Sequence, residues 1–169
     1  FRKLNKNYIC DSFETIVGFG PNGAIVHYRP VIGKDLIIEG NNLLLVDTGA
    51  HYNCGTTDIT RTFSIGVPSS EMIEISTMIL ASHINLAISI FPKKTTGKQL
   101  DAISRHNLWN NKIDYGHGTG HGVGHILNVH ENPVSISKNS DNHIDEGNII
   151  SNEPGHYKTN NFGIRHENL

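Results

Sequence analysis

The amino-acid sequence predicts an α+β domain in which pairs of antiparallel strands flank two helices. Three observations carry this prediction. An apolar run at residues 42–48 leads through a turn to a second strand pattern, residues 68–110 contain two helical patterns, and residues 148–167 contain two strand patterns around a polar turn. The chain has 169 residues, enough for one domain with a core of ordinary size.

Composition argues against several classes of protein. A formal net charge of −2 gives no basic surface, so neither nucleic acid nor a membrane is an expected partner. Cys10 and Cys54 are too few for a disulfide framework and fit a reducing, cytoplasmic location. The least charged run, residues 75–92, is interrupted by polar side chains and therefore predicts a buried helix, not a membrane span.

The N-terminal region predicts short strands after a polar, irregular start at residues 1–12. Phe13–Val17 and Ala24–Tyr28 read as strands joined by the turn-forming residues 18–23. The next strand, Asn42–Thr48, contains four consecutive apolar residues, which is typical of a strand covered on both faces.

Two aspartates lie on the strands around residue 53. Asp47 lies near the end of the first strand, and Asp58 lies near the start of the second, Thr57–Ile65. A turn near residues 52–55 would place them opposite or diagonal, with Cβ atoms roughly 5–8 Å apart. Like charges that face each other destabilise a sheet, and a divalent cation between them reverses that effect. The pattern fits a metal site, or two surface aspartates beside a turn.

Capping residues predict the two helices. Serines before Glu71 indicate a long helix from Pro68 to about Phe91. Thr96 and Gln99 form a capping-box pattern at the start of the second helix. The apolar side of this helix is expected to comprise Leu100, Ala102, Ile103, Leu108 and Trp109, with Trp109 packed inside.

A stretch rich in glycine and histidine, Gly116–Glu131, follows the second helix. Its histidines are His117, His121, His125 and His130. A neutral imidazole offers a lone pair to a metal or a proton, so the group indicates a metal or proton-transfer site. The alternative is a glycine-rich loop that happens to contain histidines. The glycines disfavour a helix and suit a loop that passes close to a site.

The last segment repeats the arrangement of the first hairpin. Strands at Asn148–Ser151 and Phe162–Glu167, with a turn near residues 158–161, would place Glu153 across from Glu167. Four carboxylates and one histidine form an oxygen-rich ligand set that suits Mn²⁺, Co²⁺ or Zn²⁺ in a two-metal site. The residues alone therefore predict a dinuclear metallohydrolase.

Five sequence blocks resemble the pita-bread metallopeptidases, and most closely the Xaa-Pro aminopeptidases (aminopeptidase P). The blocks are residues 20–28, 47–50 with 55–62, 117–124, 152–155 and 163–168. The resemblance implies a pita-bread fold, a mostly antiparallel curved sheet covered by helices. It also implies that residues 1–169 are a catalytic domain without the N-terminal domain and the final strand of the family, truncated at both ends.

The resemblance assigns five metal ligands. Asp47 would hold one ion, His121 and Glu153 would hold the other, and Asp58 and Glu167 would bridge them. Bridging carboxylates use both oxygens, and water held between two cations loses a proton near neutral pH. The implied cofactor is two divalent ions, with Mn²⁺ expected first and Co²⁺ or Zn²⁺ as alternatives.

Further residues would act on the substrate. Glu153 would also take the proton from water and pass it to the leaving nitrogen. His27 would stabilise the tetrahedral intermediate, His117 would contact the substrate backbone, and His130 would relay protons or hold the proline side. Arg165 would position Glu167. His125, His156 and His166 depart from the family pattern and are interpreted as drift.

The implied function is a dinuclear metal-dependent aminopeptidase that hydrolyses the bond between an N-terminal residue and a following proline. The expected partners are peptides with proline at the second position, and a homodimer is allowed through the complete protein. Alternatives are a prolidase, which accepts only dipeptides, a methionine aminopeptidase, which fits less well, and a non-catalytic pita-bread module or the remnant of an interrupted gene. Because the final strand is missing, we expect Glu167 to be the least well fixed ligand, and folding to be strongly coupled to metal binding.

Overall fold

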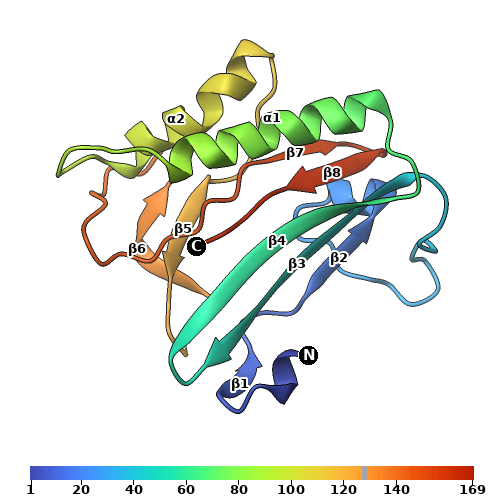
Figure 1. Cartoon of the computed structure of the whole chain (residues 1–169), viewed down its shortest axis with the longest axis horizontal. Coiled ribbons are helices and arrows are strands. Elements are labelled where there is room, and N and C mark those ends of the chain that lie inside the picture. Colours follow the sequence, from blue (N-terminus) through green and yellow to red (C-terminus); the bar gives the residue numbers. More distant parts are fainter. Residues whose placement is uncertain (127–128) are drawn as a thin grey trace.

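The structure is a computed structural model, and it describes residues 1–126 and 129–169. In chain order the elements are η1 (Arg2–Leu4), β1 (Tyr8–Asp11), β2 (Ile16–Phe19), η2 (Gly20–Ala24), β3 (Asn42–Tyr52), β4 (Gly55–Ile65), α1 (Ser70–Ala87), α2 (Gly97–Asn110), β5 (Gly120–Val123), β6 (His130–Ile136), β7 (Gly155–Lys158) and β8 (Phe162–Arg165). The strand pairs are antiparallel, and both helices lie on one side of the long β3–β4 hairpin (Figure 1). The predicted α+β class is confirmed.

The β3–β4 hairpin places both aspartates on one buried face. Asp47 pairs with Thr60 and Gly49 pairs with Asp58, so the two carboxylates are diagonal neighbours, as the hairpin prediction allowed. Alternate residues of β3, including Leu45 and Asp47, are buried, whereas their neighbours are half-buried. The cover expected on both faces of β3 is therefore complete on one face and only partial on the other.

The main core lies between α1, β8 and the start of β3. Its buried members are Leu43, Met72, Ile75, Ile79, Leu108, Tyr115, Phe162 and Ile164. Helix α1 begins where the hydroxyl of Ser69 accepts a hydrogen bond from the N–H of Met72 at 3.2 Å. This core fixes β7 and β8 beneath α1, between that helix and the β3–β4 hairpin (Figure 1).

A second, smaller core supports the β5–β6 pair. It comprises Leu86, Leu100 and Ile136, which come from α1, α2 and β6. Strand β5 also lies against the segment around Ser151, and a Cβ added to Gly120 would lie 1.8 Å from the Ser151 carbonyl oxygen. Only glycine permits this approach, so the histidine-rich stretch is held against the segment that leads to Glu153.

Several predicted strands are placed differently. The first lies at Ile16–Phe19 instead of Phe13–Val17, and Ala24–Tyr28 is not a strand, because a 3₁₀ turn at Gly20–Ala24 brings its backbone against β8. A Cβ added to Gly163 would lie only 1.8 Å from the Gly23 carbonyl oxygen. Asn148–Ser151 forms only an isolated bridge, between Gly122 and Ile150.

Other differences concern the ends of the chain and the histidine-rich stretch. Residues 8–11, predicted irregular, pair with the end of β3. The stretch Gly116–Glu131 is not wholly a loop, because it contains β5 and the start of β6, and its Leu127 and Asn128 lie outside the described residues. Helix α1 ends at Ala87, before the predicted end near Phe91.

Helix α2 buries a polar side. Thr96 and Gln99 form the predicted capping box, and Leu100 and Leu108 are buried as expected. Ala102, Ile103 and Trp109 are exposed, so their predicted packing is wrong. The remaining buried residues of α2 are Gly97, Asp101, Ser104 and Arg105. These polar side chains, not apolar ones, meet the segment that carries His117 and Thr119.

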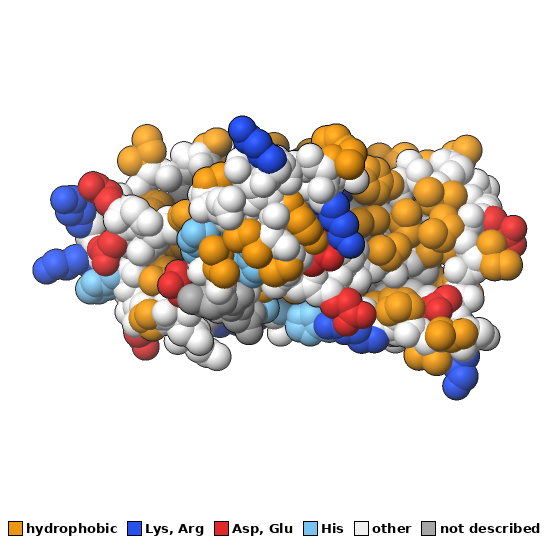
Figure 2. Space-filling model, turned by 90° about the horizontal axis from the view of Figure 1, so that it is seen from below, with side chains coloured by type: hydrophobic (Ala, Val, Ile, Leu, Met, Phe, Trp, Pro, Cys, Tyr) orange, Lys and Arg blue, Asp and Glu red, His pale blue; other side chains and the backbone are white. Residues whose placement is uncertain are grey.

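The surface view shows where apolar and histidine side chains gather. Hydrophobic side chains concentrate at the right-hand end of Figure 2, and histidines reach the surface near the middle of this face. At the same end of Figure 1 lies the loop that precedes β3, whose exposed apolar residues include Val31, Ile32 and Ile37. Within the described part of the chain, no helix is long and apolar enough to cross a membrane.

Candidate metal centre

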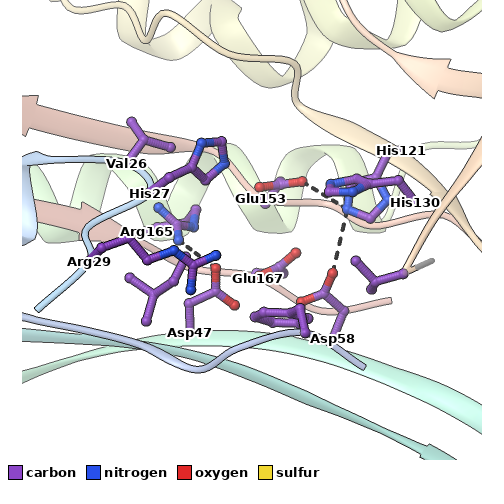
Figure 3. Close-up of a pocket in the computed structure, with 13 residues that line it drawn as sticks. Val26, His27, Arg29, Asp47, Asp58, His121, His130, Glu153, Arg165 and Glu167 are labelled. Atoms are coloured by element: carbon purple, nitrogen blue, oxygen red, sulfur yellow. Dashed lines mark hydrogen bonds and ion pairs between the residues drawn. The ribbon is translucent and has the colours of Figure 1, made fainter. Parts of the chain in front are cut away.

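The predicted carboxylates and His121 meet in one pocket of about 350 Å³. Asp47 and Asp58 come from β3 and β4, while His121 comes from β5 (Figure 3). Glu153 precedes β7 and Glu167 follows β8, and the bridge between Asn152 and Asn168 continues the register of that hairpin. Glu153 therefore lies across from Glu167, as the sequence predicted, and the two hairpins face each other across the pocket.

The distances among these groups suit a shared cation. Ligand atoms of Asp58, His121 and Glu167 all lie within 4.8 Å of one another. The Nε2 atom of His121 lies 3.4 Å from Asp58 Oδ2 and also 3.4 Å from Glu153 Oε1. Donors 3.4 Å apart can bind one ion together, because metal–oxygen and metal–nitrogen bonds of this kind are about 2.0–2.2 Å long.

The tautomer of His121 is set by its own backbone. Its Nδ1 lies 2.8 Å from the carbonyl oxygen of Gly122, which can only accept a hydrogen bond. In the neutral ring the proton is therefore on Nδ1, and the lone pair of Nε2 points toward Asp58 and Glu153 (Figure 3). Burial opposes the charged ring, but the hydrogen bond that this ring donates to Asp58 and the charge of Glu153 raise the pKa of His121 in the metal-free protein.

Without a bound metal, too little positive charge lies near the carboxylates to balance their negative charge. Burial raises the pKa of Glu153 to about 7, and burial together with the charges of Glu153, Asp58 and Asp47 raises the pKa of Glu167 to about 9. Burial also raises the pKa of Asp47, although Arg165 opposes this. The Oδ1 atom of Asp47 is buried without a hydrogen-bond partner. A cation would give these oxygens the partner that they lack, so the donor set fits divalent metal.

Arg165 contacts Asp47, not Glu167. Its Nη2 donates to Asp47 Oδ2 at 2.6 Å and its Nε donates to Thr60 Oγ1 at 3.1 Å. Thr60 in turn donates to Glu167 Oε2 at 2.6 Å, so Arg165 reaches Glu167 only through this hydroxyl. Burial opposes the charge of Arg165, but Tyr157 and Asp47 raise its pKa above the ordinary value.

His117 lies next to the pocket but is not among the residues that line it. Its Nδ1 donates to the Gly118 carbonyl at 2.7 Å, and its Nε2 accepts from the Tyr157 hydroxyl at 2.8 Å. That hydroxyl also accepts from Arg165 at 2.8 Å, so the direction of both bonds is fixed. Burial lowers the pKa of His117 to about 4, and burial raises the pKa of Tyr157 to about 12.

His27, His130 and Arg29 lie at the edge of the pocket. His27 and Arg29 extend from the loop that follows η2, on the Asp47 side (Figure 3). His130 lies on the other side, with its ring centroid 4.1 Å from that of His121. The apolar lining consists of Phe13, Ile16, Val26 and Val129.

Glu167 is firmly held, contrary to the expectation that it would be the least well fixed ligand. It is 1% exposed, and its N–H donates to the Thr60 carbonyl at 3.2 Å. Its own carbonyl accepts from Arg61 at 2.7 Å. Strand β4 thus supplies the partners that the prediction expected from a further strand.

Two supporting residues, Thr60 and Tyr157, were not predicted. Thr60 lies two residues after Asp58 on β4, and its bonds to Glu167 and Arg165 join residues more than 100 positions apart in sequence. Tyr157 lies in the hairpin between Glu153 and Arg165. A buried phenol among charged residues requires a hydrogen-bond partner, and strand alternation from Glu153 through Gly155 to Tyr157 could have placed it on the pocket side.

Comparisons with known proteins agree with this geometry. The whole chain, residues 1–169, matches Metallopeptidase family M24. The probable Xaa-Pro aminopeptidase P of Botryotinia fuckeliana is 47% identical over 171 residues, covering 99% of this chain and 26% of that protein.

Solved structures give the same result. The X-prolyl aminopeptidase of Caenorhabditis elegans, described as a cytosolic enzyme with a di-nuclear active site, has a TM-score of 0.91 and 40% identity over 98% of this chain and 27% of its own. The prolidase of Pyrococcus furiosus has a TM-score of 0.84 and 32% identity over 95% of this chain and 46% of its own. The chain therefore spans 26% to 46% of the length of these relatives. The predicted pita-bread fold is confirmed, and the chain belongs to metallopeptidase family M24.

Proposed function

We propose that this chain supplies the metal centre of a dinuclear aminopeptidase that removes an N-terminal residue preceding proline. The observation that carries the proposal is the convergence of four carboxylates and one imidazole in a single pocket, with Asp47 Oδ1 buried and unpartnered. The similarity to Xaa-Pro aminopeptidases adds support for the substrate class. We place residues 1–169 in the catalytic domain of a cytoplasmic enzyme, for which a homodimer is allowed.

The proposed ligands are Asp47, Asp58, His121, Glu153 and Glu167. Asp47 would hold one ion and His121 with Glu153 the other, while Asp58 and Glu167 would bridge them. Two divalent ions, Mn²⁺ first and Co²⁺ or Zn²⁺ as alternatives, would supply Lewis acidity and lower the pKa of water. The short distances from His121 Nε2 to Asp58 and to Glu153 support this division of ligands.

Protein side chains would handle the protons and the developing charge. The Oε1 atom of Glu153 accepts a hydrogen bond from Ser151 at 3.0 Å and faces the pocket, so Glu153 can take a proton and pass it to the leaving nitrogen. His27 at the rim would stabilise negative charge on the substrate oxygen, and His130 would hold the proline side or relay protons. Arg165 holds Asp47 in place. For His117 we propose a substrate contact that requires release of Tyr157, because both ring nitrogens are otherwise engaged.

The pocket wall fits a substrate with a small apolar ring. Phe13, Ile16, Val26 and Val129 provide apolar surface beside the carboxylates. A pyrrolidine ring can be desolvated against such side chains, whereas its tertiary amide lacks the N–H that an ordinary peptide bond would require the site to satisfy.

The test measures metal content and substrate range together. The complete domain that contains this chain should bind two Mn²⁺, cleave Xaa-Pro-Yaa peptides with a free N-terminus, and act poorly on Xaa-Ala-Yaa. Full activity with one tightly bound ion would contradict the bridging roles of Asp58 and Glu167. Cleavage of Xaa-Pro dipeptides alone would establish a prolidase instead, in line with the similarity to the Pyrococcus furiosus enzyme. Metal binding without hydrolysis of any of these peptides would favour a non-catalytic module.

A further inference from the structure

A buried ion pair on α2 lies outside the pocket and has no part in the reaction proposed above. Asp101 and Arg105 are one helical turn apart, and both are 1% exposed. Arg105 Nε donates to Asp101 Oδ2 at 2.7 Å. Burial of a charge pair costs desolvation, and apolar residues of similar volume are often equally stabilising, so helix packing alone does not explain why the pair is there.

Arg105 binds the backbone that enters the histidine-rich stretch. Its Nη1 donates to the Tyr115 carbonyl at 2.8 Å and to Asp114 Oδ1 at 2.5 Å, and its Nη2 donates to the His117 carbonyl at 2.6 Å. The guanidinium also stacks 3.7 Å from the centroid of the Tyr115 ring. One planar group thus fixes several successive points of the chain, which a single ammonium could not do.

Asp101 holds the next point along this chain. The hydroxyl of Thr119, which is fully buried, donates to Asp101 Oδ1 at 2.6 Å. The Tyr115 hydroxyl lies 2.5 Å from the same Thr119 oxygen and therefore donates to it, because the Thr119 proton is already used. The ion pair thus forms hydrogen bonds to this segment both before and after His117.

Thr119 connects the Asp101–Arg105 ion pair to the proposed metal ligands. Its carbonyl accepts from the N–H of Glu153 at 2.7 Å. The Ser151 hydroxyl accepts from the N–H of His121 at 3.0 Å and donates to Glu153 Oε1 at 3.0 Å. Gly120 packs closely against the Ser151 backbone, so neither segment can shift toward the other. A displacement of Thr119 would therefore move His121 and Glu153 together.

We propose that Asp101 and Arg105 are positioning residues that set the geometry of His121 and Glu153 by holding Thr119 and the Tyr115–His117 backbone. This inference deepens the proposed function and rests on it only for the choice of ligands. Groups that orient metal ligands from behind affect metal affinity by about 10- to 100-fold when they are removed.

The experiment removes the hydrogen bond between Thr119 and Asp101 while it keeps the shape of the Thr119 side chain. Thr119→Val deletes the hydroxyl, and Thr119→Ser restores it. Ser82→Ala is the matched control, since the Ser82 hydroxyl is also fully buried against α2, where it donates to the Ser104 carbonyl at 2.6 Å away from the metal pocket. Mn²⁺ affinity is measured by titration calorimetry, thermal unfolding gives stability, and kcat and KM come from Xaa-Pro-Yaa hydrolysis.

We expect Thr119→Val to weaken Mn²⁺ binding about tenfold or more and to lower kcat with little change in KM. Thr119→Ser should bind Mn²⁺ as the unchanged protein does, and Ser82→Ala should lose stability alone. If Thr119→Val does not fold, Arg105→Lys replaces it, and the same loss of affinity is expected. Wild-type Mn²⁺ affinity in a folded Thr119→Val or Arg105→Lys variant would overturn the inference. The affinity comparison needs no substrate, so failure of peptide hydrolysis would refute the proposed function without deciding this point.

Discussion

Thr60 joins the two hairpins that carry the carboxylates. Its hydroxyl, which is fully buried, donates to Glu167 Oε2 and accepts from Arg165 Nε. Arg165 in turn binds Asp47, so one hydroxyl links a proposed ligand from each hairpin. The hydroxyl supplies both a donor and an acceptor without charge, whereas a carboxylate would add negative charge to an already acidic site.

Replacement of Thr60 by valine tests this link. Thr60→Val keeps the branched shape but leaves Glu167 Oε2 and Arg165 Nε without their partner. We expect a loss of about 1–3 kcal/mol in the free energy of unfolding, and a Mn²⁺ affinity reduced by about tenfold or more. Thr77→Val is the control, since the exposed Thr77 hydroxyl bonds only within its own helix, to the Ile73 carbonyl. Equal behaviour of the two variants would contradict the role of Thr60.

The proposed metal ligands could be predicted from the sequence, whereas the residues that hold them in place could not. Apolar runs and turn residues in the sequence indicate the strands and turns that carry the four carboxylates. The approach of these residues therefore follows from local pattern, and they are Asp47, Asp58, Glu153 and Glu167. The role of Thr60 and the attachment of Arg165 to Asp47 depend on contacts between hairpins distant in sequence. Tyr157 accepts from Arg165 within its own hairpin, but its bond to His117 joins residues 40 positions apart. No local pattern specifies which of several nearby carboxylates an arginine will bind.

At the scale of elements, the proposed site depends on a close approach between β5 and the segment around Ser151. The glycines of Gly116–Glu131 predicted a loop that passes close to a site, because each glycine disfavours a helix. In the structure Gly120 brings two backbones together, but part of the stretch is strand, since β5 pairs with β6. The predicted apolar side of helix α2 is wrong in part because the buried side of this helix faces polar backbone as well as apolar side chains.

A pair of glycine substitutions tests this contact. Gly120→Ala would place a Cβ 1.8 Å from the Ser151 carbonyl oxygen, whereas Gly116→Ala would meet nothing within 4 Å. We expect Gly120→Ala to destabilise the fold by about 1–3 kcal/mol or more, as overpacking does, and to weaken Mn²⁺ binding. Gly116→Ala should be neutral or stabilising by about 0.4–1 kcal/mol, because it restricts the unfolded chain. Thermal unfolding and Mn²⁺ titration of both variants decide the matter, and a tolerated Gly120→Ala would mean that β5 can shift without harm to the site.

At the scale of the whole molecule, two sets of buried titratable groups change the stability of the metal-free fold with pH in opposite directions. Buried carboxyl groups at the centre hold their protons to higher pH than in the unfolded chain, with pKa values raised to about 7 for Glu153 and about 9 for Glu167. Burial lowers the pKa of His117 and of His166 to about 4. The carboxyl groups therefore penalise folding at alkaline pH, and these histidines penalise it at acidic pH.

The sign of each contribution gives a testable pH profile for the metal-free protein. Raised carboxyl pKa values mean that the folded state binds more protons, so stability falls as pH rises from about 4.3, the unfolded value, through 7 and toward 9. The raised pKa of His121 acts in the same direction, because its charged form is favoured in the fold and is lost on deprotonation. The lowered histidine pKa values act oppositely, since stability is lost as pH falls from about 6.5 toward 4.

These effects oppose each other between about pH 4.3 and 6.5, so the metal-free protein should be most stable in that window, with stability falling at higher pH. Bound Mn²⁺ removes the alkaline loss, because the cations stabilise the charged carboxylates that otherwise repel one another. The difference in Tm between Mn²⁺-saturated and EDTA-treated protein should accordingly widen as pH rises from 5 to 8, and it should do so in thermal scans at constant ionic strength. A Tm in EDTA that increases steadily through pH 7 and 8 would contradict this account, since it would mean that the carboxylates are already compensated by Arg165 and His121 without metal.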